Sequence, residues 1–340
     1  VSQEEWLNCG VCEDCFLPAY DMRPGVSAQA AIAQADFGGD EPRHFKFGFI
    51  ASSDVHSARA GIGYKEVDRA RNIDFVGQAL KWGERTPDGP LELRRPEQVL
   101  ATPNTIFNRE RNVSMLYTGG LAAVHSEGRT REEIWDALKR NEVYGTSGPR
   151  MLLWFDHIDV DGFATPMGQQ VGAANTATFR ARALGEFKQK PGCPDYVESA
   201  LGSDQQRLCG GECFNPSDER TDLARLEIIK ILPQQSPEEE LEDLIIDPWR
   251  SFDCDGPECE VTFSDPDFLS GGREAAYYVR AVQVATPTIN GDGLRCEYDE
   301  EGRCTAVNIC YGHGATDRGD DCLAEVEHRA WSSPIWLGQN

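Results

Sequence analysis

Positive charge is scarce in this chain. It has 33 lysine and arginine residues against 57 aspartate and glutamate residues, which gives a formal net charge of −24. A surface of that sign repels phosphate backbones and anionic lipid headgroups, so we expect no nucleic acid among its partners. Long apolar runs are missing as well. No stretch of about 18 apolar residues occurs, which argues against a membrane span.

Two further signals are absent. The chain begins at Val1 without a basic and then apolar leader, and we expect that Val1 is not the translational start. Residues 144–150 are expected to form a Gly-rich loop, but the stretch lacks the lysine spacing of a P-loop, so it predicts no nucleotide site.

Cysteine, by contrast, is abundant, with 12 residues. Their even number and their loop-like flanks predict disulfides in an oxidising compartment, either periplasmic or extracellular. We expect most of the last four to be bridged, with Cys296 joined to Cys304 across an acidic turn, or Cys304 joined to Cys310. The Cys-x2-Cys-x2-Cys group at residues 9–15 leaves open a zinc or iron–sulfur site.

The chain length suggests two domains after an opening segment. Residues 1–40 are irregular and Cys-rich, residues 41–150 read as α/β, and residues 151–340 read as β-rich and disulfide-containing. Helices are expected over residues 27–35, capped by Ser27, and over residues 131–140, begun by a capping box of Thr130 and Glu133. The second helix would carry Ile134, Trp135 and Leu138 on one face.

The β-rich part is predicted from alternation of apolar and polar residues. It gives strands near residues 151–155, 177–183, 226–230 and 276–284, with long loops at 185–220, 233–273 and 286–326. Short strands between long loops are typical of a β-sandwich.

The stretch around Asp54 and His56 organises the chemistry. An apolar run over residues 47–50 predicts a buried strand, and residues 54 and 56 project to the same side of an extended chain just beyond it. A carboxylate oxygen and an imidazole nitrogen together suit a divalent metal. A second apolar stretch, residues 121–124, is expected to be a short buried strand that delivers His125 and Glu127 to a strand end.

The motif Asp54-Val55-His56, followed by Ser57-Ala58-Arg59, resembles the last metal-binding motif of the polymerase-and-histidinol-phosphatase (PHP) superfamily. More narrowly, the chain resembles the DUF3604 family, a PHP-like group of bacterial proteins. The segments that carry this resemblance are residues 108–110, 119–121, 132–140, 143–150 and 330–336.

The resemblance implies a fold, a cofactor and residue roles. Residues 41–150 would be the C-terminal part of a distorted β/α barrel. Zinc, manganese or iron ions would be bound by Asp54 and His56. Such ions lower the pKa of a bound water, which then attacks a phosphoester or a carbonyl of a small-molecule substrate. His125 would be a ligand or substrate contact, or instead a buried histidine bonded to backbone; Arg59 would bind an anionic oxygen, or form a structural salt bridge.

One departure from the PHP pattern divides the interpretation. None of the six histidines forms the early His-x-His motif of that superfamily. The missing ligands would then lie on a preceding N-terminal segment or a separate chain, which makes this sequence the C-terminal part of a metal-dependent hydrolase. The alternative is a non-catalytic extracellular binding or scaffold protein that keeps the fold without the chemistry.

Overall fold

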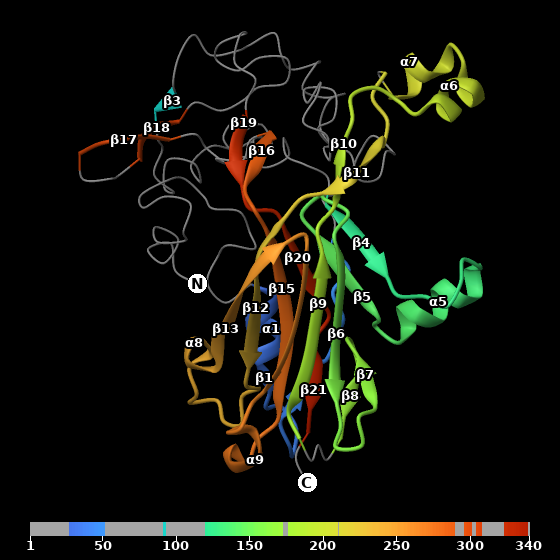
Figure 1. Ribbon diagram of the computed structural model, residues 1–340. Helices are drawn as coiled ribbons and strands as arrows, with labels where there is room; N and C mark the ends of the chain where they lie inside the picture. Colours follow the sequence, from blue (N-terminus) through green and yellow to red (C-terminus); the bar gives the residue numbers. More distant parts are fainter. Residues whose placement is uncertain are drawn as a thin grey trace.

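Two β-sheets packed face to face carry most of the described chain in the computed structural model (Figure 1). The structure describes residues 27–51, 91–92, 120–172, 176–209, 211–289, 296–300, 304–307 and 323–338. The larger sheet has the strand order β13-β12-β15-β20-β5-β4, with β21 pairing with β15 and β8. Its strands are β4 (Leu121–Val124), β5 (Val143–Thr146), β8 (Gln170–Val171), β12 (Leu223–Ile231), β13 (Ile245–Gly256), β15 (Ala275–Gln283), β20 (Arg329–Ser332) and β21 (Ile335–Leu337).

The smaller sheet has the order β14-β9-β6-β7. Its strands are β6 (Leu152–Ile158), β7 (Ala164–Pro166), β9 (Thr178–Leu184) and β14 (Glu258–Ser264). The expected sheet-rich second part is therefore confirmed, and the strands predicted near residues 151–155, 177–183, 226–230 and 276–284 correspond to β6, β9, β12 and β15.

The main core lies between the two sheets. Phe179 on β9 is fully buried, and its ring lies 5.3 Å from that of Phe155, 5.5 Å from that of Phe263 and 4.6 Å from that of Tyr277, measured between centroids. Alternation along β9 turns Phe179, Ala181 and Ala183 inward. Burial of this aromatic cluster supplies much of the hydrophobic stabilisation that joins the sheets.

A second core covers the other face of the larger sheet. Ile229, Tyr278 and Trp336 pack there against Ile32 and Ala33 of helix α1 (Ala28–Ala33). Strand β15 is consequently buried on both faces, which explains why its sequence is almost continuously apolar. The Ser27 side chain accepts a hydrogen bond from the Ala30 N–H, so the predicted N-cap is confirmed.

The part of the chain expected to complete a barrel has a different arrangement. Strands β4 and β5 pair antiparallel, joined by helix α5 (Arg131–Lys139), and the described residues form no closed barrel. Strand β4 lies at the sheet edge and is only partly buried, unlike the buried strand expected there. Residues 144–146, expected in a loop, belong to β5, because Ser332, Trp331 and Ala330 of β20 pair with them.

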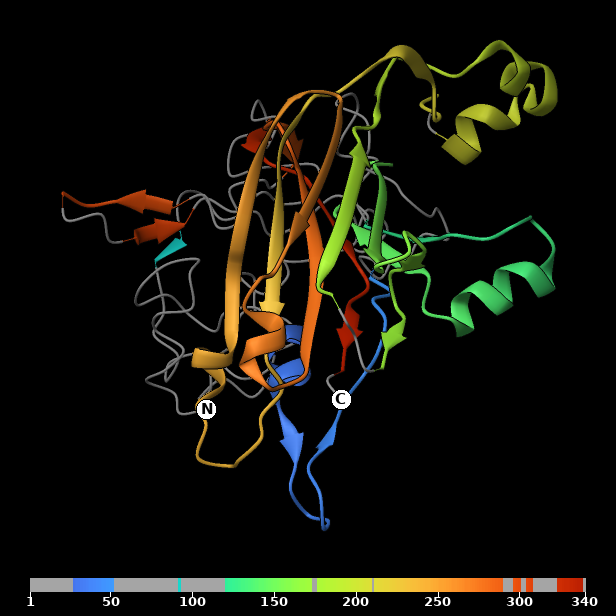
Figure 2. The same cartoon turned by 60° about the horizontal axis from the view of Figure 1, so that its bottom comes forward.

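Helix α5 begins at the predicted capping box, in which Thr130 and Glu133 satisfy each other's backbone N–H groups. The predicted apolar face is only partly right. Ile134 and Leu138 are half-buried, but Trp135 is 57% exposed, while Ala137 is the buried residue. Figures 1 and 2 both show α5 standing away from the sandwich, which is why so little of it is covered by the described residues.

The apolar run at residues 47–50 is not a buried strand. It pairs with no strand among the residues that the structure describes, and Ile50 is 65% exposed. Phe47 and Phe49 are partly buried and pack against the second core. The Phe49 N–H donates to the Ser333 hydroxyl instead of to a neighbouring strand, so a side chain takes the place of a sheet partner.

Three long stretches expected to be loops contain regular elements. Residues 185–220 form an arm that leaves one end of the sandwich, with a β10–β11 ribbon at its base and α6 and α7 at its tip (Figure 2). A disulfide between Cys193 and Cys213 closes this arm. A second disulfide, between Cys254 and Cys259, closes the β13–β14 hairpin. The arm's elements are β10 (Phe187–Gln189), α6 (Asp195–Leu201), α7 (Asp204–Cys209) and β11 (Pro216–Arg220).

The remaining elements are short. Ribbons form between β1 (Ala35–Asp36) and β2 (Arg43–His44) and between β16 (Thr286–Ile289) and β19 (Leu323–Val326), and a small sheet joins β3 (Leu91–Glu92), β17 (Cys296–Tyr298) and β18 (Cys304–Val307). Helices α8 (Leu241–Leu244) and α9 (Phe268–Gly271) complete the described elements. Cys296 pairs with Val307 and Cys304 with Tyr298, while the cysteine side chains themselves lie outside what the structure describes.

Candidate functional site

The predicted metal ligands Asp54 and His56, together with Arg59, lie outside the described residues. The chain can be followed to Ala51, which lies against Gly145 of β5. A Cβ atom placed on Gly145 would stand 2.6 Å from the Ala51 Cβ, so this close approach requires glycine. The segment that leads to Asp54 is therefore anchored beside β5.

His125 follows strand β4 directly. Its Nε2 donates a hydrogen bond of 2.7 Å to the Leu153 carbonyl, and its ring centroid lies 5.4 Å from that of Tyr144 and 5.7 Å from that of Trp154. Because a carbonyl only accepts, the proton sits on Nε2 and the ring orientation is fixed. This is the backbone-bonded state named above as the alternative to a ligand role; a catalytic role for His125 stays a prediction.

His125 and Ala51 lie on different sides of β5. His125 contacts the ring of Tyr144, whereas Ala51 contacts Gly145, the next residue along the strand. Neighbouring residues of a strand project to opposite faces. The described residues therefore do not place His125 beside the segment leading to Asp54. The other strand-end candidate, Glu127, is exposed.

The Tyr144 ring, which contacts His125, belongs to the core between the two sheets. Its hydroxyl donates a 3.0 Å hydrogen bond to the Met151 carbonyl. Burial raises the pKa of Tyr144 to about 12, so it is a neutral hydrogen-bond donor near pH 7. The Arg150 guanidinium lies 4.0 Å from the ring centroid of Phe214, a residue of the arm formed by residues 185–220.

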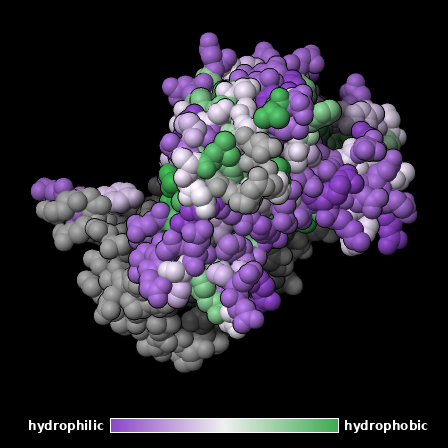
Figure 3. Space-filling view, turned by 90° about the horizontal axis from the view of Figure 1, so that it is seen from below, coloured by the Kyte–Doolittle hydropathy of each residue, from purple (hydrophilic) through white to green (hydrophobic). Residues whose placement is uncertain are grey.

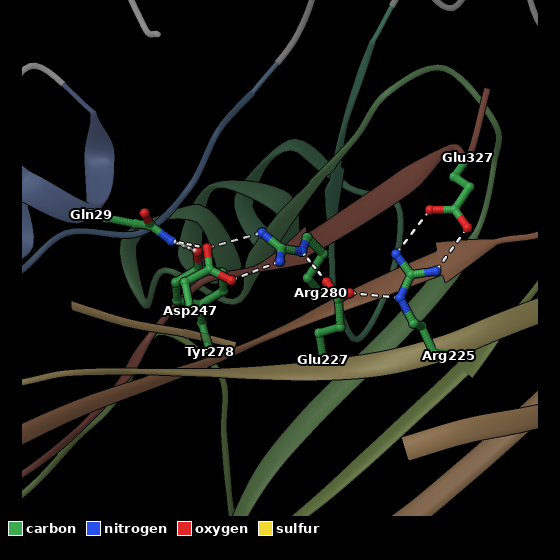
Figure 4. A network of polar contacts seen from close by, with 7 residues as sticks. All are labelled: Gln29, Arg225, Glu227, Asp247, Tyr278, Arg280 and Glu327. Carbon is green, nitrogen blue, oxygen red and sulfur yellow. Dashed lines mark hydrogen bonds and ion pairs between the residues drawn. The ribbon is translucent and has the colours of Figure 1, made fainter. Parts of the chain in front are cut away.

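Sequence reasoning missed a chain of ion pairs on the outer face of the larger sheet (Figure 4). Arg280 is its centre: it contacts Glu227, its cross-strand neighbour, and Asp247, at 2.7 Å. Arg225 bridges Glu227 at 2.6 Å and Glu327 at 2.8 Å. Burial alone would raise the pKa of Glu227, but hydrogen bonds from Arg225 and Arg280 lower it below its ordinary value. The sequence does show Arg225 and Glu227 alternating along β12. It does not show that β13 and β15 are the strands that pair with β12.

A second charged group faces the core between the sheets. Asp265 accepts from Lys230 at 2.5 Å and from the Tyr277 hydroxyl at 2.6 Å, and only 1% of its side chain is exposed. Burial acts to raise the pKa of Asp265, but these two donors lower it overall. The same contact and burial raise the pKa of Tyr277, so the hydroxyl keeps its proton.

We expect the protein to lose stability in acid when carboxylates with a lowered pKa become protonated. Glu239 is the clearest case. Hydrogen bonds from Arg273 hold the pKa of Glu239 at about 2, below its ordinary value of 4.5. A depressed native pKa contributes stability that is present above pH 4.5 and lost as the pH falls towards 2. Glu239→Gln should therefore lower the free energy of unfolding by about 1 kcal/mol at pH 7 and by much less at pH 2.

The free energy of unfolding in urea is measured for the wild-type protein and for Glu239→Gln, at pH 7 and at pH 2. Glu242→Gln is the matched control, because Glu242 is exposed on the neighbouring helix α8 and should change little. Equal destabilisation of Glu239→Gln at both pH values would contradict the assignment.

The described residues offer neither a cluster of metal ligands nor a helix suited to a membrane. No three histidine, cysteine, aspartate or glutamate residues there gather in a group that could hold a metal ion. None of the described helices combines the length and apolar character needed to cross a bilayer. The two disulfides are compatible with an oxidising compartment. The surface seen in Figure 3 is mostly hydrophilic, with hydrophobic residues in small groups.

Comparison with known proteins gives one match. The family model described as "Protein of unknown function (DUF3604)" matches residues 34–180. That span runs from the end of α1 through β4, α5, β5 and β6 into β9, and it includes Asp54, His56 and His125. No curated protein and no solved structure matches the chain.

Proposed function

Since residues 34–180 belong to the DUF3604 family, we propose that the chain is the C-terminal part of a metal-dependent hydrolase of the PHP type, acting on phosphoesters or related esters. The observation that carries the proposal is the Asp54-Val55-His56 motif inside the matched span. The remaining metal ligands would come from a preceding segment or a separate chain.

The donor set of Asp54 and His56 fits a divalent ion such as zinc, manganese or iron. The carboxylate offsets part of the ion's charge, and neutral imidazole adds a nitrogen ligand without further charge. When bound, such an ion lowers the pKa of a water molecule so that a nucleophile is available near neutral pH.

The other proposed roles belong to the chain's own side chains. Arg59 would bind an anionic substrate oxygen by charge-assisted hydrogen bonds. His125 is the weaker candidate for a substrate contact, because its ring and Ala51 lie on opposite faces of β5. We further propose a periplasmic or extracellular location, which the two disulfides support.

Metal analysis of the purified protein, together with the segment or chain that precedes it, tests the proposal. We expect bound zinc, manganese or iron in at least equimolar amount, and hydrolysis of p-nitrophenyl phosphate that chelation abolishes and added metal restores. Absence of metal and of chelator-sensitive hydrolysis would contradict the proposal.

The second candidate is a non-catalytic extracellular binding or scaffold protein. The feature that favours it is the disulfide-closed arm of residues 185–220, which projects from the sandwich in both ribbon views and exposes Tyr196 at its tip. A projecting arm closed by a disulfide is suited to contact with another molecule.

A further inference from the structure

The outward face of the smaller sheet carries two rows of side chains across its strands. In one row Trp154 of β6 lies opposite Arg182 of β9, which lies opposite Glu260 of β14. In the adjacent row Asp156 lies opposite Arg180. Because these residues alternate with the buried ones, all of them project away from the core. Their backbone positions are fixed by sheet hydrogen bonds.

A cavity of about 230 Å³ lies over these rows. It is lined by Trp154, Asp156, Arg180, Arg182 and Glu260. Trp154 is half-buried, and it is the only aromatic residue among the residues that line this cavity. Its ring also contacts that of His125, so the cavity adjoins the end of β4. The residues come from three adjacent strands, which gives a more precise site than loops would.

Both arginines over this cavity are already paired with carboxylates. Arg180 pairs with Asp156 at 3.0 Å, and Arg182 pairs with Glu258 at 2.5 Å and with Glu260 at 3.7 Å. The Arg182 guanidinium also lies 5.3 Å from the Trp154 ring centroid. An anionic ligand would have to displace carboxylates from both arginines, inside a chain of net charge −24. A metal cation would have to displace the arginines from the same carboxylates.

A neutral ligand with many hydroxyl groups meets none of these costs. Guanidinium N–H groups donate to hydroxyl oxygens, and carboxylates accept hydroxyl protons, so one sugar diol satisfies both members of an ion pair. The indole offers an apolar wall for the C–H face of the same ring. At about 230 Å³ the cavity is smaller than a typical pocket for a drug-sized ligand, so it suits a ligand portion of about one sugar ring.

We propose that this face of the smaller sheet binds a neutral saccharide, with Trp154 as the apolar wall and the Arg180–Asp156 and Arg182–Glu260 pairs as the hydroxyl-binding groups. The proposal is independent of the hydrolase proposal, because it uses neither Asp54 nor His56. It assigns binding alone, and no bond of the saccharide is broken.

Saturation-transfer NMR with maltose, cellobiose and chitobiose as probes tests it on the full chain. We expect at least one of them to bind with a dissociation constant on the order of 1 mM, and Trp154→Ala and Glu260→Gln each to weaken that binding about tenfold or more. Glu260 is largely exposed, so Glu260→Gln should fold normally even if Trp154→Ala does not. Glu219→Gln is the matched control, because Glu219 forms an exposed ion pair with Lys188 on the arm.

Three outcomes would overturn the proposal. They are no binding of any probe at 10-fold above the expected dissociation constant, unchanged binding by Glu260→Gln, and preferential binding of glucuronate or inorganic phosphate over the neutral sugars.

Discussion

Replacing His56 by alanine is expected to remove bound metal and phosphoesterase activity together, each by more than about 100-fold, while the sandwich stays folded. The imidazole would supply a nitrogen ligand that alanine cannot replace, and the lone carboxylate of Asp54 would then hold the ion weakly. The aromatic core between the sheets is built by other residues, including Phe155, Phe179 and Tyr277. The midpoint of thermal unfolding of the metal-free proteins should therefore be unchanged.

The controls separate metal binding from a general effect of losing a histidine. His44→Gln removes an imidazole that lies 3.2 Å from Glu274 and 3.0 Å from the Gln234 carbonyl. It should lower stability slightly and leave metal content unchanged. Asp54→Asn should reproduce the loss of metal, because an amide oxygen is a weaker ligand than a carboxylate.

The result also decides between the two proposed functions. If the His56→Ala variant keeps its metal, or keeps the phosphoesterase activity of the wild-type protein, the binding or scaffold protein becomes the better interpretation. Inductively coupled plasma mass spectrometry and steady-state hydrolysis of p-nitrophenyl phosphate give the two readouts on the same preparations.

Asp265→Ala should lower the free energy of unfolding by about 3–5 kcal/mol. Asp265 is almost fully buried and accepts hydrogen bonds from both Lys230 and Tyr277. Its removal leaves the ammonium of Lys230, whose side chain is only 12% exposed, without its carboxylate partner. The Trp249 and Tyr277 rings, whose centroids lie 5.5 Å and 5.8 Å from the ammonium, cannot compensate for that charge.

The destabilisation should come from the unpaired charge and not from the loss of an attractive pair as such. A double variant, Lys230→Met with Asp265→Ala, should recover part of the lost stability, because replacing a buried pair by apolar groups is often close to neutral. Glu219→Ala, which breaks the exposed pair with Lys188, should change the unfolding free energy by less than about 1 kcal/mol.

Urea denaturation at pH 7 measures all four proteins on one scale. A loss below about 1 kcal/mol for Asp265→Ala would mean that water reaches Lys230 in the native state, which would contradict the burial described above. A double variant that is less stable than Asp265→Ala would contradict the electrostatic explanation.

Local sequence was sufficient where the decisive interactions are themselves local. Ser27 caps α1 and the Thr130–Glu133 box starts α5, because in each case the bond spans only three residues. Strands β9, β12 and β15 were recognisable from their composition and period. The resemblance to the DUF3604 family was also recognisable from segments inside the matched span of residues 34–180, although the segment at residues 330–336 lies outside it.

Strand β13 was not recognisable, and its absence from the prediction has a clear cause. Strand β13 contains Pro248 and four acidic or basic residues, so its sequence reads as a loop. It is a strand because it lies at the sheet edge and pairs with β12, with an irregular register near the proline. The Cys254–Cys259 disulfide closes the hairpin that follows.

The sequence by itself determined the helix caps, the sheet-rich character of the second part and the match of residues 34–180 to the DUF3604 family model. Tertiary structure alone decided which strands are neighbours, that Phe49 bonds to Ser333 in place of a strand, and that Arg280 meets Glu227 and Asp247. It also decided that Trp154 shares one outward face with Arg182 and Glu260. These contacts join residues far apart in the chain, and whether they form depends on the free energy of the whole sandwich, which no local pattern of residues encodes.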